Sequence, residues 1–202
     1  MDDRTFNEAV DLLAQSDRDL AMIVTRYGLP TPWRREPGFA TLIRIILEQQ
    51  VSLASAKVAF DRLSDSLGEI TPPKLIQLSD EELKRVGFSR QKTRYARELA
   101  TAILDKNLDL RALEQLDSAT VRQKLTAIKG IGDWTADMYL MMALGRLDVF
   151  PAKDLAVAIA IKEIKQLDTR PSISELTDIA AAWQPYRAIA TMLLWHYYLN
   201  RK

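Results

Sequence analysis

The chain has 202 residues, enough to bury an apolar core, and its 48% hydrophobic and 27% charged residues are typical of a globular protein. It contains no cysteine and one histidine, which excludes disulfides, a thiol nucleophile, a cysteine-held zinc or iron–sulfur centre and a histidine-rich metal site. The net charge of +1 indicates no particular partner, so any binding of nucleic acid has to depend on local geometry.

Apolar residues recur at helical spacing almost throughout the chain, and no alternating strand pattern appears, so we expect an all-α fold. Pro30, Pro32 and Pro37-Gly38 should end an N-terminal pair of helices. A buried helix is then expected around Leu42–Leu47, followed by the polar turn Glu48-Gln49-Gln50-Val51-Ser52.

The middle of the chain carries clear helix-start signals. Pro72-Pro73 should open a short helix, and Ser79-Asp80-Glu81-Glu82 places acidic groups at the positive end of another. Gly87-Phe88-Ser89 separates that helix from a long basic one. This region has six basic residues that are candidates for phosphate contacts, although such a run is more often a solvated helix face. They are Lys84, Arg85, Arg90, Lys92, Arg94 and Arg97.

No apolar run approaches the roughly 20 residues of a membrane span, and the first residues lack a secretion-signal pattern. We therefore expect a cytoplasmic protein that is not embedded in a membrane.

Residues 125–144 read LTAIKGIGDWTADMYLMMAL, two apolar helical stretches around the turn Lys129-Gly130-Ile131-Gly132-Asp133. Both glycines permit positive φ and close approach of another molecule. Successive amide N–H groups next to the following helix would form an anion-binding concavity, while Ile131 plugs between the helices. Asp133 suits an N-cap, but it would repel a phosphate unless it points away. The plain alternative is a tight helical hairpin with a glycine cap.

The stretch L-x-x-I-K-G-I-G-D-W-T-A resembles the helix-hairpin-helix of the DNA glycosylase superfamily that includes endonuclease III. Residues 149–155, VFPAKDL, resemble the proline–aspartate segment of that superfamily. Residues 42–56, 86–100 and 183–195 are similar to its 3-methyladenine DNA glycosylase II (alkylpurine) branch. Together the similar segments span roughly residues 36–200.

This resemblance implies an all-α, two-lobed fold with a central cleft. Residues 36–145 would form a central helical lobe with the wedge turn and the hairpin. Residues 1–35 plus 146–202 would form a second lobe that carries the catalytic aspartate.

The resemblance assigns catalysis to Asp154, whose carboxylate would stabilise positive charge on the deoxyribose and orient or deprotonate water. From the residues alone, Asp154 is the N-cap of the helix LAVAIAIKEI, and the two roles are compatible because a helix N-terminus favours negative charge. Trp134 stands where bifunctional relatives carry a Schiff-base lysine, which implies a monofunctional enzyme. An indole also attracts a cationic alkylpurine, so Trp134 is a candidate for the base pocket; the alternative is a core tryptophan.

A base must leave the duplex to be reached, and Gln50 matches the family position that fills the gap; its alternative is a polar turn capped by Ser52. The family likeness gives strand binding to Lys129, Gly130, Ile131 and Gly132. It also implies that the carbonyls of Thr126, Ile128 and Ile131 hold Na⁺ or K⁺, with no required cofactor and no iron–sulfur cluster. The late aromatic residues are candidates for the pocket or for the core: Trp183, Tyr186, Trp195 and Tyr198.

We therefore expect a DNA-3-methyladenine glycosylase II-type hydrolase of base excision repair. It would act as a monomer on alkylated purines in damaged double-stranded DNA. Three alternatives stay open: a glycosylase for another base lesion, a non-catalytic helix-hairpin-helix DNA-binding protein, and a helical interaction protein with no role on DNA.

Overall fold

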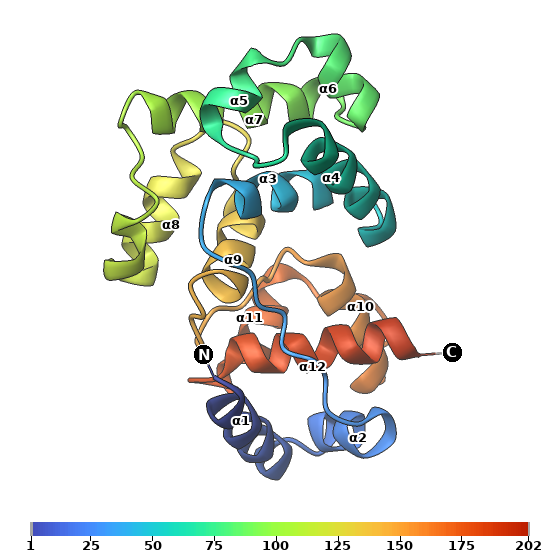
Figure 1. Cartoon of the computed structure of the whole chain (residues 1–202). Coiled ribbons are helices and arrows are strands. Elements are labelled where there is room, and N and C mark those ends of the chain that lie inside the picture. Colours follow the sequence, from blue (N-terminus) through green and yellow to red (C-terminus); the bar gives the residue numbers. More distant parts are fainter. Residues whose placement is uncertain (1, 202) are drawn as a thin grey trace. The chain divides into compact units, whose positions relative to one another are not determined.

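The computed structural model describes residues 2–201, and all regular structure in that range is helical, which confirms the predicted all-α class (Figure 1). The helices are α1 (Asp3–Ser16), α2 (Arg18–Tyr27), α3 (Phe39–Glu48), α4 (Leu53–Leu67), α5 (Pro72–Gln77), α6 (Asp80–Val86), α7 (Arg90–Leu104), α8 (Ser118–Thr126), α9 (Asp133–Met142), α10 (Leu155–Ile164), α11 (Ile173–Ala181) and α12 (Arg187–Asn200), with a 3-10 turn at Ala112–Gln115.

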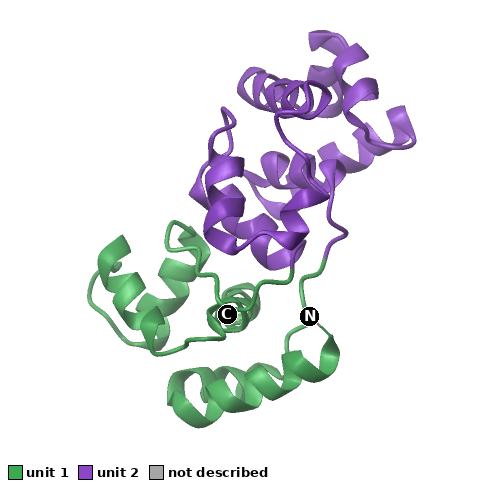
Figure 2. Ribbon diagram, turned by 90° about the vertical axis from the view of Figure 1, so that its left-hand side faces the viewer, with its two compact units in different colours: residues 1–34, 145–202 green, residues 35–144 purple. Residues whose placement is uncertain are grey.

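The chain divides into two compact units (Figure 2). Unit 1 joins the residues up to Arg34 with those from Gly145 onward, and unit 2 comprises Arg35–Leu144. The sequence-based boundaries are 36–145 for the central lobe and 1–35 plus 146–202 for the other.

Unit 2 is built around α3 and α9, whose sequences are apolar on nearly every face. Because such helices are stable only when surrounded, α3 packs against α4, α7 and α9, while α5 and α6 pack on α7. The backbone N–H of Gly38 donates to the Tyr139 hydroxyl at 3.0 Å, and burial raises the pKa of Tyr139 to about 12. Arg35 forms two bonds of 2.9 and 2.7 Å with the buried Glu48 carboxylate, which ties the start of the unit to the end of α3.

The helix starts follow the signals in the sequence. Ser79 accepts the N–H of Glu82 while Glu82 accepts that of Ser79, a reciprocal capping box at the start of α6. Gly87 ends α6 at a φ of 115°, in the left-handed region, and Ser89 then caps α7. Pro72 occupies the first turn of α5. These predicted boundaries are confirmed.

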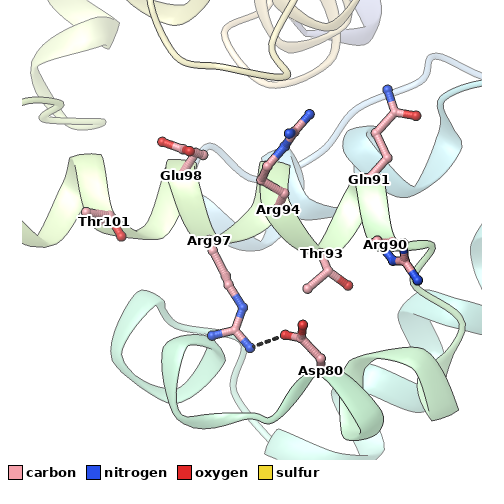
Figure 3. Close-up of a pocket in the computed structure, with 8 residues that line it drawn as sticks. All are labelled: Asp80, Arg90, Gln91, Thr93, Arg94, Arg97, Glu98 and Thr101. Carbon is pink, nitrogen blue, oxygen red and sulfur yellow. Dashed lines mark hydrogen bonds and ion pairs between the residues drawn. The ribbon is translucent and has the colours of Figure 1, made fainter.

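The six basic residues of this region differ in their surroundings. Arg97 donates to the Leu78 carbonyl and to Asp80, both at 2.8 Å, and Lys92 donates to a backbone carbonyl of α3, so both have structural partners. Figure 3 shows Arg97 and Thr93 pointing from α7 toward α6, with Arg94 on the other side. Arg90, Arg94 and Arg97 line a shallow groove of about 760 Å³ along α7, and no residue assigned to catalysis, the base pocket or the hairpin lines it. Contact of these basic residues with phosphate therefore stays a prediction.

Unit 1 is organised by α12, which packs against α10, α2 and α1. Ile189, Met192 and Leu193 of α12 are at most 1% exposed, as their helical spacing predicts. No helix in the described part of the chain is long and apolar enough to cross a membrane.

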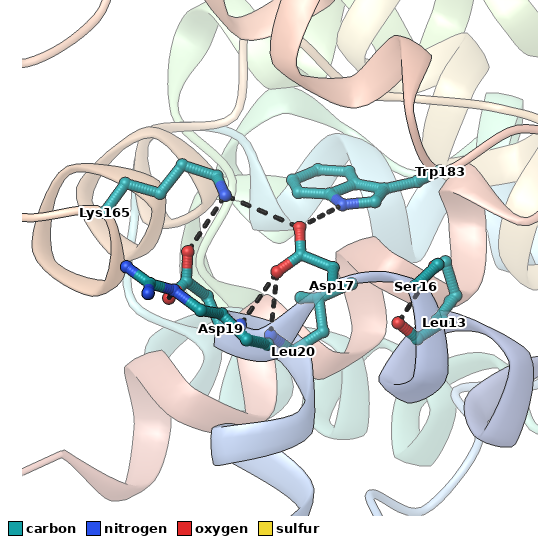
Figure 4. A network of polar contacts seen from close by, with 8 residues as sticks. Leu13, Ser16, Asp17, Asp19, Leu20, Lys165 and Trp183 are labelled. Carbon is teal, nitrogen blue, oxygen red and sulfur yellow. Dashed lines mark hydrogen bonds and ion pairs between the residues drawn. The ribbon is translucent and has the colours of Figure 1, made fainter.

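Asp17, between α1 and α2, is the polar centre of unit 1 (Figure 4). Its carboxylate caps α2 by accepting the N–H groups of Asp19 and Leu20. It also accepts the Trp183 indole N–H at 2.9 Å and the Lys165 ammonium at 3.4 Å. The indole of Trp183 is 1% exposed, so the core interpretation holds for this residue.

We predict that Asp17→Asn destabilises the protein at neutral pH but not at low pH. Burial alone would raise the pKa of Asp17, but the bonds from Trp183 and Asp19 and the charge of Lys165 outweigh it, so the pKa lies below its usual value. A lowered folded-state pKa gives stability that is complete above the unfolded-state value of about 4 and is lost as pH falls through the folded value.

Chemical denaturation at about pH 7 and about pH 2 measures the free energy of unfolding of wild type and of Asp17→Asn. The gap between wild type and Asp17→Asn should close at the lower pH, while exposed Asp178→Asn serves as a control for loss of charge alone. An equal gap at both values would show that charge is not what Asp17 contributes.

Candidate active site

The glycine turn joins α8 to α9 as a compact hairpin in unit 2. Ile131 is 3% exposed and its N–H donates to the Ile128 carbonyl at 3.0 Å, so this side chain fills the space between the two helices as expected. An ion pair between Arg122 of α8 and the buried Asp137 of α9 adds a polar link across the hairpin. The buried Ile131 side chain and this ion pair thus both link α8 to α9.

The two glycines of the turn do different things. Gly130 has a φ of 96°, and a Cβ built on it would lie 2.0 Å from Cγ of Tyr95, so side-chain packing and backbone conformation both require glycine there. Gly132 has φ −96° and ψ −178°, with open space where a Cβ would stand, so the expectation of positive φ at both glycines is wrong at Gly132.

Gly132 is also the N-cap of α9, and its carbonyl accepts the N–H of Ala136. Asp133 is the first residue of the helix and not its cap, which corrects the sequence-based expectation. The extended backbone of Gly132 allows the helix to begin one residue earlier. Lys129 and Gly132 are exposed, and they lie beside the positive end of α9.

The turn between α3 and α4, predicted to carry the wedge residue Gln50, has an unusual backbone. Gln50 is exposed and has a φ of 57°, in the left-handed region where a residue with a side chain costs roughly 1–2 kcal/mol. Val51 and Leu53 flank it with 45% and 44% of their surface exposed. Ser52 caps α4 by accepting the N–H of Ser55, so the capping interpretation is confirmed; it leaves the tip of the turn to Gln50.

Trp134 lies in the first turn of α9 and is half-buried, whereas the residues that follow it in this helix are buried. It is thus neither a fully buried core residue nor an exposed one. Its position two residues after exposed Gly132 places an indole at the edge of the glycine turn, within unit 2.

Asp154 belongs to unit 1, where it is the N-cap of α10, as predicted. The residue is 9% exposed, and its Oδ1 accepts the Val157 N–H at 2.9 Å and the Trp195 indole N–H at 3.2 Å. Two donors and the positive end of α10 fix the carboxylate and stabilise its negative charge. Next to it, Lys153 and Leu155 are exposed.

Trp195 contacts the Asp154 carboxylate because α12 packs on α10. The ring of Trp195 lies against that of Trp33, with centroids 5.0 Å apart and planes tilted by 31°. The sequence singles out Trp195 only as one of several late aromatics and gives no signal for Trp33. The helical spacing of Trp195 predicts a core residue. Its hydrogen bond to the Asp154 carboxylate, 41 positions away, becomes visible only in the structure.

Known proteins resemble this chain over most of its length. The family model described as "HhH-GPD superfamily base excision DNA repair protein" matches residues 43–185. The alkylbase DNA glycosidase-like protein of Schizosaccharomyces pombe is 28% identical over 200 residues, which cover 96% of this chain and 94% of the relative.

Two solved structures agree with this match. The 3-methyladenine DNA glycosylase of Schizosaccharomyces pombe, in complex with abasic DNA, has a TM-score of 0.88 at 27% identity, covering 93% of this chain and 95% of that one. The DNA-3-methyladenine glycosidase of Bacillus halodurans has a TM-score of 0.76 at 32% identity, covering 96% and 89%. The predicted helix-hairpin-helix glycosylase fold and its 3-methyladenine branch are confirmed, and the chain belongs to the HhH-GPD superfamily of base excision DNA repair proteins.

Proposed function

We propose that this protein is a monofunctional DNA glycosylase that hydrolyses the N-glycosidic bond of alkylated purines, of the 3-methyladenine type, in duplex DNA. The observation that carries the proposal is the Asp154 carboxylate, held at the start of α10 by Val157 and Trp195. The chain belongs to a superfamily of base excision repair proteins, and relatives similar to it are named alkylbase and 3-methyladenine glycosylases.

The proposed chemistry needs one fixed anion. As the C1′–N bond breaks, its electron pair goes to the base and positive charge develops on the deoxyribose. The Asp154 carboxylate stabilises that charge and orients a water, whose oxygen bonds to C1′ while its proton passes to the carboxylate or to solvent. Alkylation has already placed positive charge on the purine, so the base is a good leaving group and this single anion suffices.

Trp134 fits a reaction that ends at the abasic site. An indole has no amine to form a Schiff base, so the sugar is released by water and the strand stays intact. Its face attracts a cationic base by up to about 2 kcal/mol when the site is dry. Trp134 would therefore favour charged alkylpurines over neutral bases.

Strand binding is assigned to the hairpin and the wedge turn of unit 2. Exposed Lys129 and Gly132, beside the positive end of α9, suit a phosphate. Gly130, packed against Tyr95, and the buried Ile131 shape the turn, so both have a supporting part in that contact. Gln50, projecting at φ 57° between exposed apolar neighbours, suits insertion into the base stack once the damaged nucleotide is extruded. We expect one protein molecule to act on one lesion.

The hairpin also has carbonyls that fit a monovalent cation. Thr126 ends α8, where helix carbonyls lack intrahelical partners, and the Ile128 carbonyl keeps a second lone pair after accepting the Ile131 N–H. Together with the Ile131 carbonyl they supply the hard oxygen donors that Na⁺ or K⁺ prefers. A cation there would hold the turn and add positive charge near the phosphate. No other cofactor is required by the proposed reaction.

We predict that Asp154→Asn lowers base release from methylated duplex DNA by about 10²–10⁴-fold. The amide keeps an oxygen that can accept both hydrogen bonds, so the helix start is retained while the negative charge is lost. Release of 3-methyladenine and 7-methylguanine is measured by chromatography, with binding to abasic-site DNA and the unfolding midpoint as integrity checks. Asp178→Asn is the matched control, because this aspartate is exposed on α11.

Three outcomes of this assay decide between functions. Release that disappears in Asp154→Asn alone supports the proposal. Release that survives in the variant contradicts the role of Asp154. Tight binding to abasic DNA without any release by wild type would instead indicate a non-catalytic relative.

We also predict that borohydride traps no covalent complex between the wild-type protein and damaged or abasic DNA, because Trp134 supplies no amine. Gel electrophoresis of the reaction under denaturing conditions measures this, with a bifunctional glycosylase as positive control. A shifted protein–DNA band would show that a lysine elsewhere acts as nucleophile and that the enzyme is not monofunctional.

A further inference from the structure

Gln49, the residue before the wedge tip, has its side chain directed into the hairpin. Its amide nitrogen donates to the Gly130 carbonyl at 3.0 Å and to the Thr135 hydroxyl at 2.9 Å. One acceptor belongs to the glycine turn and the other to the first turn of α9, where Thr135 is 2% exposed. A single side chain therefore links the end of α3 to both parts of the strand-binding hairpin.

Helix α7 holds the same two elements from another direction. The Lys92 ammonium donates to the Leu47 carbonyl at 2.7 Å, in the last turn of α3, and burial lowers the pKa of Lys92. Tyr95, one turn further along α7, lies against Gly130. All these contacts are internal to unit 2, so α3, α7 and the hairpin form one braced assembly.

The brace matters because the residue after Gln49 is the wedge tip. Gln50 is held in a left-handed conformation, which fixes the direction of its side chain only if the residues on both sides are themselves fixed. Gln49 supplies that constraint on one side and the Ser52 cap of α4 supplies it on the other. Both N–H donors of the Gln49 amide are used, one on the glycine turn and one on the first turn of α9.

We propose that Gln49 is a positioning residue that fixes the wedge tip Gln50 relative to the hairpin, so that insertion into the stack and binding of the strand occur together. The inference rests on the proposed function. Without the brace, the tip has to be ordered at the moment of extrusion, which adds an entropic cost to a step that is already unfavourable. The cost slows base release most for lesions that must be pulled out of a base pair, because extrusion limits their rate, and least for lesions that are already unpaired.

The test compares Gln49→Leu with wild type on two substrates under single-turnover conditions. Leucine has a similar size and cannot donate a hydrogen bond. On 7-methylguanine paired with cytosine the rate should fall by about 10–100-fold, as a small misplacement of a positioning group does. On the same lesion opposite an abasic site, where no partner base opposes extrusion, the fall should be less than about threefold.

Three variants sharpen the comparison. Gln50→Ala should show the same selective loss, and Gln49→Leu should add little to it, because a brace without a tip has nothing to position. Thr135→Val removes one of the two acceptors while keeping the side-chain size, so a smaller loss in the same direction is expected. Gln15→Leu, on the exposed face of α1 in unit 1, should leave both rates unchanged.

A readout that needs no base release separates this inference from the proposed function. In DNA with 2-aminopurine next to an abasic-site analogue, insertion of the wedge raises fluorescence, and Gln49→Leu should reduce that rise at saturating protein. If wild type inserts but releases no base, the proposed function fails and the inference stands. If Gln49→Leu slows both substrates equally, or neither, or inserts as wild type does, the inference is overturned. Loss of folding in Gln49→Leu transfers the same test to Thr135→Val.

Discussion

The hydrogen bond from the Val157 N–H to the Asp154 carboxylate is the constraint on which the proposed chemistry depends. It fixes where α10 begins, and α10 in turn packs on α12, which brings the Trp195 indole to the same oxygen. A carboxylate on a loop could turn toward any cation near it. This one has its direction determined by a backbone amide and an indole, both of which favour its negative charge. The first turn of a helix thus holds an anion in place before substrate arrives, which is the condition for electrostatic stabilisation of a developing cation.

The two glycines of the hairpin have different structural roles. Gly130 is required by its positive φ and by the ring of Tyr95, so it belongs to the packing of unit 2. Gly132 has neither constraint, and a side chain there would meet only open space. Its lack of a side chain is explained if another molecule approaches the main chain at this point. Protein packing therefore explains Gly130 but not Gly132, so Gly132 makes the stronger argument for a ligand. In the sequence the two glycines look equivalent.

Much of this architecture is predictable from the sequence because the signals are local. The caps at Ser52, Ser79 and Asp154 and the plug at Ile131 each depend on a few neighbouring residues, and the structure places them as expected. The features that sequence reasoning gets wrong or misses depend on conformation or on distant contacts. Whether glycine adopts positive φ depends on the surrounding chain, so the expectations for Gly132 and for a cap at Asp133 are wrong. The contact of Trp195 with Asp154 and that of Gln49 with Gly130 join residues 41 and 81 positions apart, and no pattern in one sequence encodes such pairs.

The proposed reaction places unequal demands on the two units. A cationic purine leaves readily, so hydrolysis asks little of unit 1 beyond one oriented carboxylate. Selection is harder, because the damaged base must be found among many paired ones and extruded from the stack at a cost. The contacts that bear on extrusion are in unit 2, where Gln49, Lys92 and Tyr95 hold the proposed wedge turn and the glycine turn together. Since a rigid wedge favours whichever nucleotide is easiest to extrude, discrimination between lesions should depend as much on the polar contacts behind Gln50 as on the groups that touch the base.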